Sequence, residues 1–232
     1  MAFKRKYPIR RRAPVRRKRT TRPKYKRRTR RPLALRNSNP NQLIAPKYIT
    51  TLKYSDIISP PSSITGLSHN WQFNINSIFD PDRTGTGHQP LGHDQLALLY
   101  YRYRVFGVSW RATFFQSANI GSVYAVVAND STTLANSSYA VMKERPHAFI
   151  KSVSTDKPTV ITGRVSLPKL NGLTSAQFKA NEQTQSLFGT NPSEQFFLNI
   201  GGIPAATTAA FPFTVDLVFH VECFDPIPLN QS

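Results

Sequence analysis

The first 36 residues of this 232-residue chain cannot form a folded unit by themselves. They contain 18 lysines and arginines and no aspartate or glutamate. A segment with so much charge of one sign cannot bury enough apolar surface to offset the entropy lost on ordering. We therefore expect residues 1–36 to form a disordered basic arm that needs a polyanion to neutralise it, and nucleic acid is the first candidate.

The composition of the arm favours phosphate binding over a purely solubilising role. Four prolines interrupt its basic clusters, which argues against one continuous helix. Arginine outnumbers lysine 13 to 5, and guanidinium groups bind phosphate bidentately and stack on bases. Nothing in such a segment can read bases in a fixed geometry, so we predict contacts without sequence specificity. The expected nucleic-acid-binding residues are Lys4, Arg5, Lys6, Arg10, Arg11, Arg12, Arg16, Arg17, Lys18, Arg19, Arg22, Lys24, Lys26, Arg27, Arg28, Arg30 and Arg31, with Tyr7 and Tyr25 placed to stack on unpaired bases.

Short basic clusters also act as nuclear import signals, so the arm has a second expected use. The clusters that fit this role are Arg16, Arg17, Lys18, Arg19, Lys26, Arg27 and Arg28. An organelle transit peptide is a weaker alternative, because the arm contains prolines and lacks an apolar helical face.

Residues 37–232 have the composition of one nearly neutral β domain. They hold 13 basic and 12 acidic residues, out of 31 and 12 in the whole chain. About 190 residues suffice for one hydrophobic core, and the abundance of Phe, Tyr, Val, Ile and Thr between prolines and glycines favours strands. Cys223 is the single cysteine, so an intrachain disulfide is excluded. No apolar run approaches the roughly 18 residues of a membrane-spanning helix, and we expect no membrane insertion.

Alternation of apolar and polar residues with period two predicts eight strands. The clearest segments are 70–78, 103–115 and 213–223, and the others are 48–58, 121–128, 147–153, 159–167 and 195–201. One-sided alternation is typical of antiparallel sheets, so the body is predicted to be all-β, either a two-sheet jelly roll or another sandwich. Two short helices are expected at 95–101, capped by Asp94, and at 139–144, capped by Ser138. The connections 79–102 and 168–194 are long enough to carry contacts or function.

The densest polar cluster is residues 80–95. Asp80 and Asp82 begin like a calcium loop, but the remaining ligand positions are missing. Gly85-Thr-Gly87 resembles a phosphate-binding turn without the Gly-Lys that should follow. We interpret the cluster as a structured loop of turns and caps, and we expect neither a metal nor a cofactor.

The last predicted strand carries Asp216, His220 and Glu222 on its polar side. They could form an acid–base group or a divalent-cation site, but an ordinary solvent or subunit-contact face is the more common use of such a pattern. His220 could then act as a pH-sensitive contact. Cys223 falls on the apolar side and is expected in the core. No nucleophile elbow or paired metal-ligand motif is present, so the chain is not expected to be an enzyme.

Two segments resemble a known family. Residues 79–95, FDPDRTGTGHQPLGHDQ, followed by YYRYRV at 100–105, are similar to the capsid proteins of small circular Rep-encoding single-stranded DNA viruses, the circovirus-like viruses. The opening KRKYPIRRRAPVRRKR is also similar to their arginine-rich start. The chain departs from the expected pattern at His93, where an aromatic residue is expected.

The resemblance implies a jelly roll with sheets BIDG and CHEF, a T=1 icosahedral shell of 60 copies, an arm that faces inward onto the genome, and nuclear entry through the arm. Sixty arms would carry on the order of 1,000 positive charges, enough to neutralise much of a small single-stranded genome at one charge per nucleotide. The loops at the sheet ends would then supply subunit contacts, for which the candidates are Asp80, Asp82, Arg83, His88, His93 and Asp94.

The sequence therefore favours a self-assembling capsid protein, found in the virion and the host nucleus. Its expected partners are further copies of itself, single-stranded DNA and nuclear import receptors, while the attachment receptor stays unknown. A cellular or ribosomal-type RNA-binding protein with a basic extension is the first alternative. The unequal long loops and an expected lack of any basic patch on the body count against it. A nuclease anchored to DNA by the arm is the second alternative.

Overall fold

The computed structural model describes residues 43–60, 69–115, 120–129, 134, 137–205, 210 and 212–228. The chain divides into two units, Met1–Arg36 and Asn37–Ser232, and every described residue belongs to the second. The expected nucleic-acid-binding and nuclear-import residues of the arm all lie outside the described residues, so their roles stay predictions.

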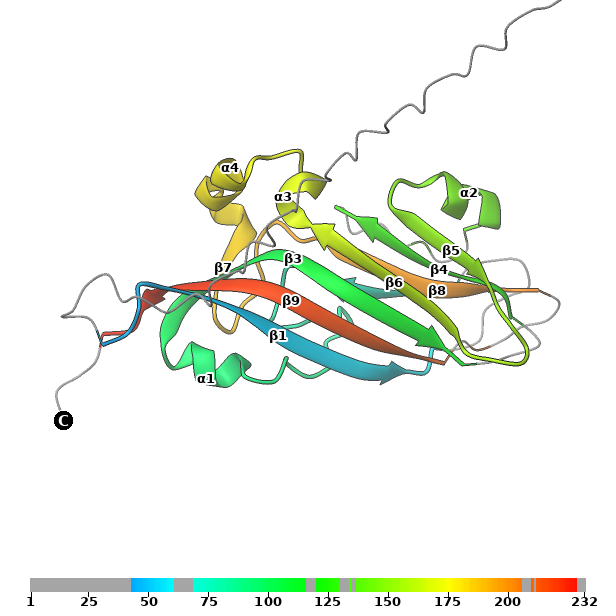
Figure 1. Cartoon of the computed structure of the whole chain (residues 1–232), viewed down its shortest axis with the longest axis horizontal. Helices are drawn as coiled ribbons and strands as arrows, with labels where there is room; N and C mark the ends of the chain where they lie inside the picture. Colours follow the sequence, from blue (N-terminus) through cyan, green and yellow to red (C-terminus); the bar gives the residue numbers. More distant parts are fainter. Residues whose placement is uncertain are drawn as a thin grey trace, which may run out of the picture. The chain divides into compact units, whose positions relative to one another are not determined.

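The body contains two antiparallel sheets (Figure 1). The first has the order β1 (Lys47–Ile58), β9 (Phe213–Pro226), β3 (Tyr100–Phe114), β6 (Thr159–Ser166), and a short β7 (Gln185–Leu187) also pairs with β3. The second has the order β2 (His69–Asn74), β8 (Phe197–Pro204), β4 (Ile120–Ala128), β5 (Ala148–Ser152). When the eight longer strands are lettered B to I along the chain, these orders read BIDG and CHEF. The predicted eight-stranded jelly roll is confirmed by its own strand order.

Period-two burial explains why these segments are strands. Along β9, Val215, Leu217 and Phe219 are fully buried, while Asp216 between them is exposed. Along β3, Val108 and Ala112 are buried in the same way, and Arg111 is exposed. The inward side chains of both sheets meet in one core, to which β4 contributes Val123 and Ala125 and β8 contributes Leu198 and Ile200. Burial of one side of each sheet fixes the register, because a shift by one residue would turn the apolar set outward.

Of the two predicted helices, one is shifted and shorter, and the other has its predicted bounds. Helix α1 (His93–Ala97) begins after Gly92, whose backbone is left-handed at φ 93, and not after an Asp94 cap. It ends early because Tyr100 already belongs to β3 and pairs with Pro226. Helix α2 (Tyr139–Glu144) follows Ser138 as predicted, although the serine side chain makes no capping hydrogen bond.

Three short helices in the connection 168–194 were not predicted. They are α3 (Leu167–Leu170), α4 (Ser175–Ala180) and the 3-10 helix η1 (Glu182–Thr184). Thr174 and Gln177 form a complete capping box at the start of α4, and that four-residue spacing is the sequence signal that indicates this helix.

Helix α2 covers part of the outer side of the second sheet. A second, smaller cluster of buried residues lies there and includes Tyr124, Val126, Met142 and Ile203. No helix among the described residues is long and apolar enough to cross a bilayer.

The contact between Gly163 and Trp110 provides a test of the first sheet. The two residues are register partners on β6 and β3, and a Cβ at Gly163 would lie 2.1 Å from Cζ2 of the buried indole. We expect Gly163→Ala to lower the free energy of unfolding by about 1–3 kcal/mol, because the core must repack around the added methyl group.

The matched control is Thr162→Ala on the same strand, where the side chain is exposed; its effect should stay within about 0.5 kcal/mol. Chemical denaturation of both variants decides the matter, and equal stability of the two would contradict the packing argument.

Candidate nucleic-acid and subunit-contact sites

The loop after β2 is held to that strand by backbone hydrogen bonds. Asn74 N donates to Pro81 O at 2.8 Å, and Arg83 N donates to Gln72 O at 3.2 Å. Phe73 and Asp82 form an isolated antiparallel bridge. The first part of the 80–94 cluster is therefore an extension of the second sheet with a defined geometry.

Asp82 is used inside the protomer. Its side chain is 1% exposed, and its Oδ1 accepts hydrogen bonds from Trp71 Nε1 at 3.1 Å and from the backbone and side chain of Thr84 at 3.0 and 2.9 Å. This carboxylate therefore stabilises the turn and fixes the Trp71 ring. Burial, followed by the charge of Asp82, raises the pKa of the neighbouring Asp80.

His93 also makes its contacts inside the protomer. The ring is 4% exposed, with centroids 5.3 Å from Phe188 and 6.3 Å from Phe79. Its Nδ1 lies 3.0 Å from Oδ1 of the exposed Asp94. At the position where the sequence resemblance leads us to expect an aromatic residue, the imidazole thus makes aromatic contacts.

Arg83 reaches the outer side of the second sheet. Its guanidinium donates to Gln72 Oε1 and lies 4.9 Å from the centroid of the Phe197 ring. Asn199, which is fully buried, accepts from both Gln72 Nε2 and Asn70 Nδ2. A network of amides therefore anchors this arginine.

His88 connects the loop to β1. Its Nδ1 lies 2.8 Å from Gln89 O, its Nε2 lies 3.0 Å from Ser55 O, and its ring packs 4.7 Å from the Tyr54 ring. Carbonyl oxygens only accept hydrogen bonds, so both contacts form only when the imidazole carries two protons. The two carbonyls raise the pKa of His88, burial opposes them, and the charge of Asp56 on β1 adds to the increase.

The candidate subunit-contact residues thus divide into two groups. Asp82 and His93 are buried, whereas Arg83, His88 and Asp94 are exposed and Asp80 is half-buried. Their role in subunit contact stays a prediction. Sequence reasoning did not single out two neighbours, Leu91 and Leu98, which are 90% and 77% exposed and give this end of the sandwich apolar surface of the kind found at interfaces.

The carboxylates of β9 have separate partners. Asp216 accepts from Ser55 Oγ at 2.6 Å, whereas Glu222 is 2% exposed and faces Arg104 and Lys179. His220 lies between them along the strand, and burial, followed by the charge of Arg164, lowers its pKa. Among the described residues, no three His, Cys, Asp or Glu side chains are grouped to hold a metal ion. Cys223 is buried in the core as predicted, and burial raises its pKa to about 12.

Glu222 holds the α4 segment against the first sheet. Its Oε1 lies 3.3 Å from Lys179 Nζ on α4, and its Oε2 lies 3.7 Å from Arg104 Nη1 on β3. Arg104 is 5% exposed, donates from Nη2 to Gln185 Oε1 at 2.7 Å and stacks 5.1 Å from the Phe224 ring. This ion group was missed from the sequence because its members are far apart along the chain.

The first sheet has a basic outer side, which corrects the expectation that the body lacks a basic patch. The positions that alternate with the core residues on β1, β3 and β6 carry cations, and β9 contributes Asp216, Glu222 and, near its end, Asp225. The outward cations are Lys47, Lys53, Arg102, Arg104, Arg111 and Arg164. The alternation of inward and outward positions along each strand was the sequence signal that could have revealed this basic side.

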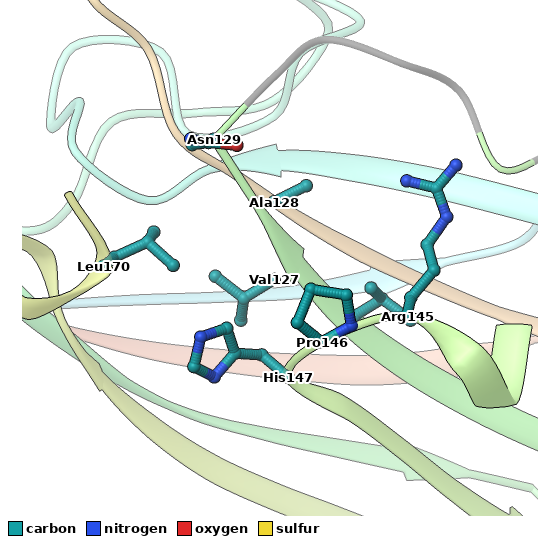
Figure 2. A pocket seen from close by; sticks show the side chains of 8 residues that line it. Val127, Ala128, Asn129, Arg145, Pro146, His147 and Leu170 are labelled. Atoms are coloured by element: carbon teal, nitrogen blue, oxygen red, sulfur yellow. The ribbon is translucent and has the colours of Figure 1, made fainter. Parts of the chain in front are cut away.

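A separate cavity of about 260 Å³ lies between the end of β4, α3 and the turn before β5 (Figure 2). Val127, Leu170 and His147 border it, and His147 adopts a left-handed backbone at φ 57. Figure 2 shows that the Arg145 guanidinium and the His147 ring point in different directions. The polar groups therefore do not converge on one ligand position.

No protein-family model and no curated protein sequence matches the chain. Among solved structures, the chain is similar to the tobacco necrosis virus protein, with 14% identity, a TM-score of 0.45, and 78% of this chain and 98% of that chain covered. It is also similar to the BFDV capsid protein solved as a 60-mer, with 13% identity, a TM-score of 0.46, and coverage of 80% and 97%. A third similar structure is the virus-like particle of the nodavirus of the prawn Macrobrachium rosenbergii, with 11% identity, a TM-score of 0.45, and coverage of 80% and 97%. Likeness at these identities concerns the fold alone, which the strand order above establishes independently.

The two carbonyl contacts of His88 predict a pH-dependent loop. Because folding raises the pKa of His88, its contribution is fully present below the unfolded value of about 6.5 and is lost as pH rises through the folded value. We expect the NMR titration midpoint of His88 to lie above 6.5, and proteolytic cleavage within 85–92 to accelerate as pH rises through that midpoint.

The control for this prediction is His147→Gln, which removes an exposed histidine whose ring makes no hydrogen bond within the described part of the chain. That variant should keep the pH dependence of cleavage, whereas His88→Gln should abolish it. A midpoint at or below 6.5 would contradict the doubly protonated ring.

Replacing Glu222 tests the ion group beneath α4. Glu222→Gln leaves the buried Arg104 guanidinium without its carboxylate, and breaking a buried pair from one side costs about 3–5 kcal/mol of folding stability. The control is Asp225→Asn, because the Arg102–Asp225 pair is about half exposed on both sides and such surface pairs contribute about 0–1 kcal/mol. Urea denaturation of the two variants checks the difference, and similar losses would refute the role given to Glu222.

Proposed function

We propose that this chain is the capsid protein of a small circular single-stranded DNA virus. The body assembles with copies of itself into a closed icosahedral shell, for which 60 subunits is the expected number. The arm of residues 1–36 binds the genome without sequence specificity. The protein then acts in the virion and in the host nucleus, which it reaches through import receptors that bind the basic clusters of the arm.

One observation carries the proposal: a BIDG/CHEF jelly roll follows directly after an acid-free segment with 18 basic residues. Jelly rolls also occur in lectins and cupins, but a carbohydrate or small-molecule site does not require an arm of this charge. A shell around nucleic acid requires both parts, because the body must pack against itself and the genome charge must be neutralised.

The charge distribution supports assembly. Residues 37–232 carry nearly equal numbers of basic and acidic residues, so adjacent bodies pack without strong mutual repulsion. The exposed leucines beside α1 and the exposed members of the 80–94 loop supply a surface for such packing. The sequence resemblance of residues 79–95 and 100–105 to circovirus-like capsid proteins supports the same assignment.

A cellular or ribosomal-type RNA-binding protein is the second candidate, and the basic outer side of the first sheet favours it more than the sequence alone did. It differs from the capsid proposal in one measurable respect, because it predicts a persistent monomer with a specific RNA partner. The nuclease alternative has less support, since Asp82, Asp216 and Glu222 each have a structural partner.

Electron microscopy of the purified full-length chain tests the proposal. With single-stranded DNA added, we expect uniform closed particles in negative stain, and binding whose log–log salt slope is about −0.7 per phosphate contact. A full-length variant with glutamine at 10–12 and 16–19 should retain the folded body but lose most of the packaged DNA. A persistent monomer, with and without DNA, would refute the capsid function.

A further inference from the structure

The basic outer side of the first sheet has cations that form no ion pair with any described residue. Arg102 pairs with Asp225, and Arg104 pairs with Glu222. By contrast, Lys53, Arg111 and Arg164 are exposed, and no ion pair or hydrogen bond engages their side chains within the described residues. Unlike the paired cations, these three stand free to bind an anion from outside.

Lys53 and Arg111 border a shallow groove, and Arg164 lies beside it on the neighbouring strand β6. Lys53, Val218, Ser109 and Arg164 are register partners across β1, β9, β3 and β6, so this row spans about 14 Å at the usual strand spacing. Arg111 lies two residues beyond Ser109 on the same side of β3. A hollow of about 430 Å³ lies here, bordered by Lys53, Ser55, Ser109, Arg111, Asp216 and Val218. Small side chains form the floor, and long cations stand at its margins.

Asp216, the register partner of Arg111, is the acidic group within this hollow, and its single negative charge is outnumbered by the three cations. Its Oδ1 accepts from Ser55 Oγ at 2.6 Å. Farther along β9, burial and the charge of Arg164 lower the pKa of His220 and so favour the neutral ring, while Glu222 is paired with Arg104 and Lys179. The groove margin therefore keeps an excess of positive charge near neutral pH.

The second sheet provides an internal comparison. Its outward positions are occupied by uncharged side chains: Asn70, Gln72 and Asn74 on β2, Phe197, Asn199 and Ile203 on β8, Tyr124 and Val126 on β4, and Ala148 and Ile150 on β5. Helix α2 and a small apolar cluster cover part of that side. Lys151 on β5 is the charged exception among the strands of that sheet, and it alternates with the outward Ala148 and Ile150. A general need for solubility would not place the outward charges of the strands on one sheet alone.

The first sheet also contains β1, the first strand that follows the arm in the sequence. Strand β1 begins at Lys47, 11 positions after Arg36, the last basic residue of the arm. Nucleic acid held by the arm is therefore tethered to the same sheet, which raises its effective concentration there.

We propose that the outer side of the β1-β9-β3-β6 sheet binds the phosphate backbone of single-stranded nucleic acid through Lys53, Arg111 and Arg164. This second contact rests on the proposed function for the identity of its ligand, but it does not depend on the arm residues. The three cations contact phosphates, and the floor around Val218 accepts the less polar sugar and base edges. The contact orients the strand on the body, where the arm alone would hold it without a fixed direction.

Salt-dependent binding of the full-length chain to labelled single-stranded DNA tests the proposal. The variant Lys53→Gln, Arg111→Gln, Arg164→Gln removes the three groove cations. The control Lys143→Gln, Arg145→Gln, Lys157→Gln removes the same charge from α2, the residue after it and the loop before β6. Three lost phosphate contacts lower the magnitude of the log–log salt slope by about 2, whereas the control slope should equal that of the wild type. Both sets are also placed in the full-length chain with glutamine at 10–12 and 16–19, where the groove should account for a larger share of the remaining binding.

The outcomes separate the two proposals. If the wild-type chain binds DNA without salt dependence, the proposed packaging function fails. If the wild type behaves as expected but the groove variant matches the control, the groove proposal alone is overturned. Heparin binding is measured in the same variants. Loss of heparin binding with unchanged DNA binding would assign the groove to a sulfated polysaccharide and overturn the proposal. Photocrosslinking of DNA to peptides from β3 and β6 is the expected positive result.

Discussion

The folded body depends on β9, because this last strand pairs with β1 on one side and with β3 on the other. Its inward residues, from Phe213 to Cys223 at alternate positions, are all fully buried. β1 and β9 are thus neighbours although they lie at opposite ends of the body's sequence. The first sheet therefore cannot complete its strand pairing until the chain from Lys47 through β9 is available. Two further features depend on the same strand, because β9 supplies Glu222 to the ion group under α4 and Asp216 to the groove.

The same alternation that builds the core also distributes the charge. A residue of β9 or β3 points either into the apolar core or outward, with no intermediate choice. On the outward side of the first sheet, Glu222 is covered by α4 and forms ion pairs with Arg104 and Lys179. Asp82 is buried beside the second sheet. A body that is nearly neutral by composition therefore need not be neutral over each surface, because several of its carboxylates are sequestered while Lys53, Arg111 and Arg164 remain in solvent.

The sequence predicted the strands well because burial on one side imposes a period that survives in the residues themselves. All eight predicted strands exist, and the largest error in their bounds is at the end of β2, which was predicted to reach residue 78 and stops at Asn74. At β3 the strand begins three residues before its predicted start, because the backbone of 100–104 also pairs with β9 and β7. Helix α4 escaped prediction because only its capping box, and no apolar period, marks six residues.

The site was less predictable than the fold, because its geometry depends on partners distant in sequence. Asp82 and His93 looked like surface residues of a polar loop, yet Trp71 and Phe188 enclose them. Glu222 looked like part of the polar side of β9, and only the fold of 167–194 over Arg104 buries it. We predicted the lack of a basic patch from the net charge of the body, and a net charge does not say where the charged residues lie on the surface.

The positions of the charged residues distinguish the expected role of the body from that of the arm. The number of charges in the arm determines how much nucleic acid it can neutralise, but it assigns no fixed path to the strand. Three cations on adjacent strands of a rigid sheet have fixed separations, and in a closed shell those separations repeat with the symmetry of the subunits. If both elements bind the genome, the arm accounts for most of the charge balance, and the groove accounts for any order that the strand adopts against the shell. The division follows from rigidity rather than from charge number, because a pre-organised contact gives up less conformational entropy on binding than a flexible one.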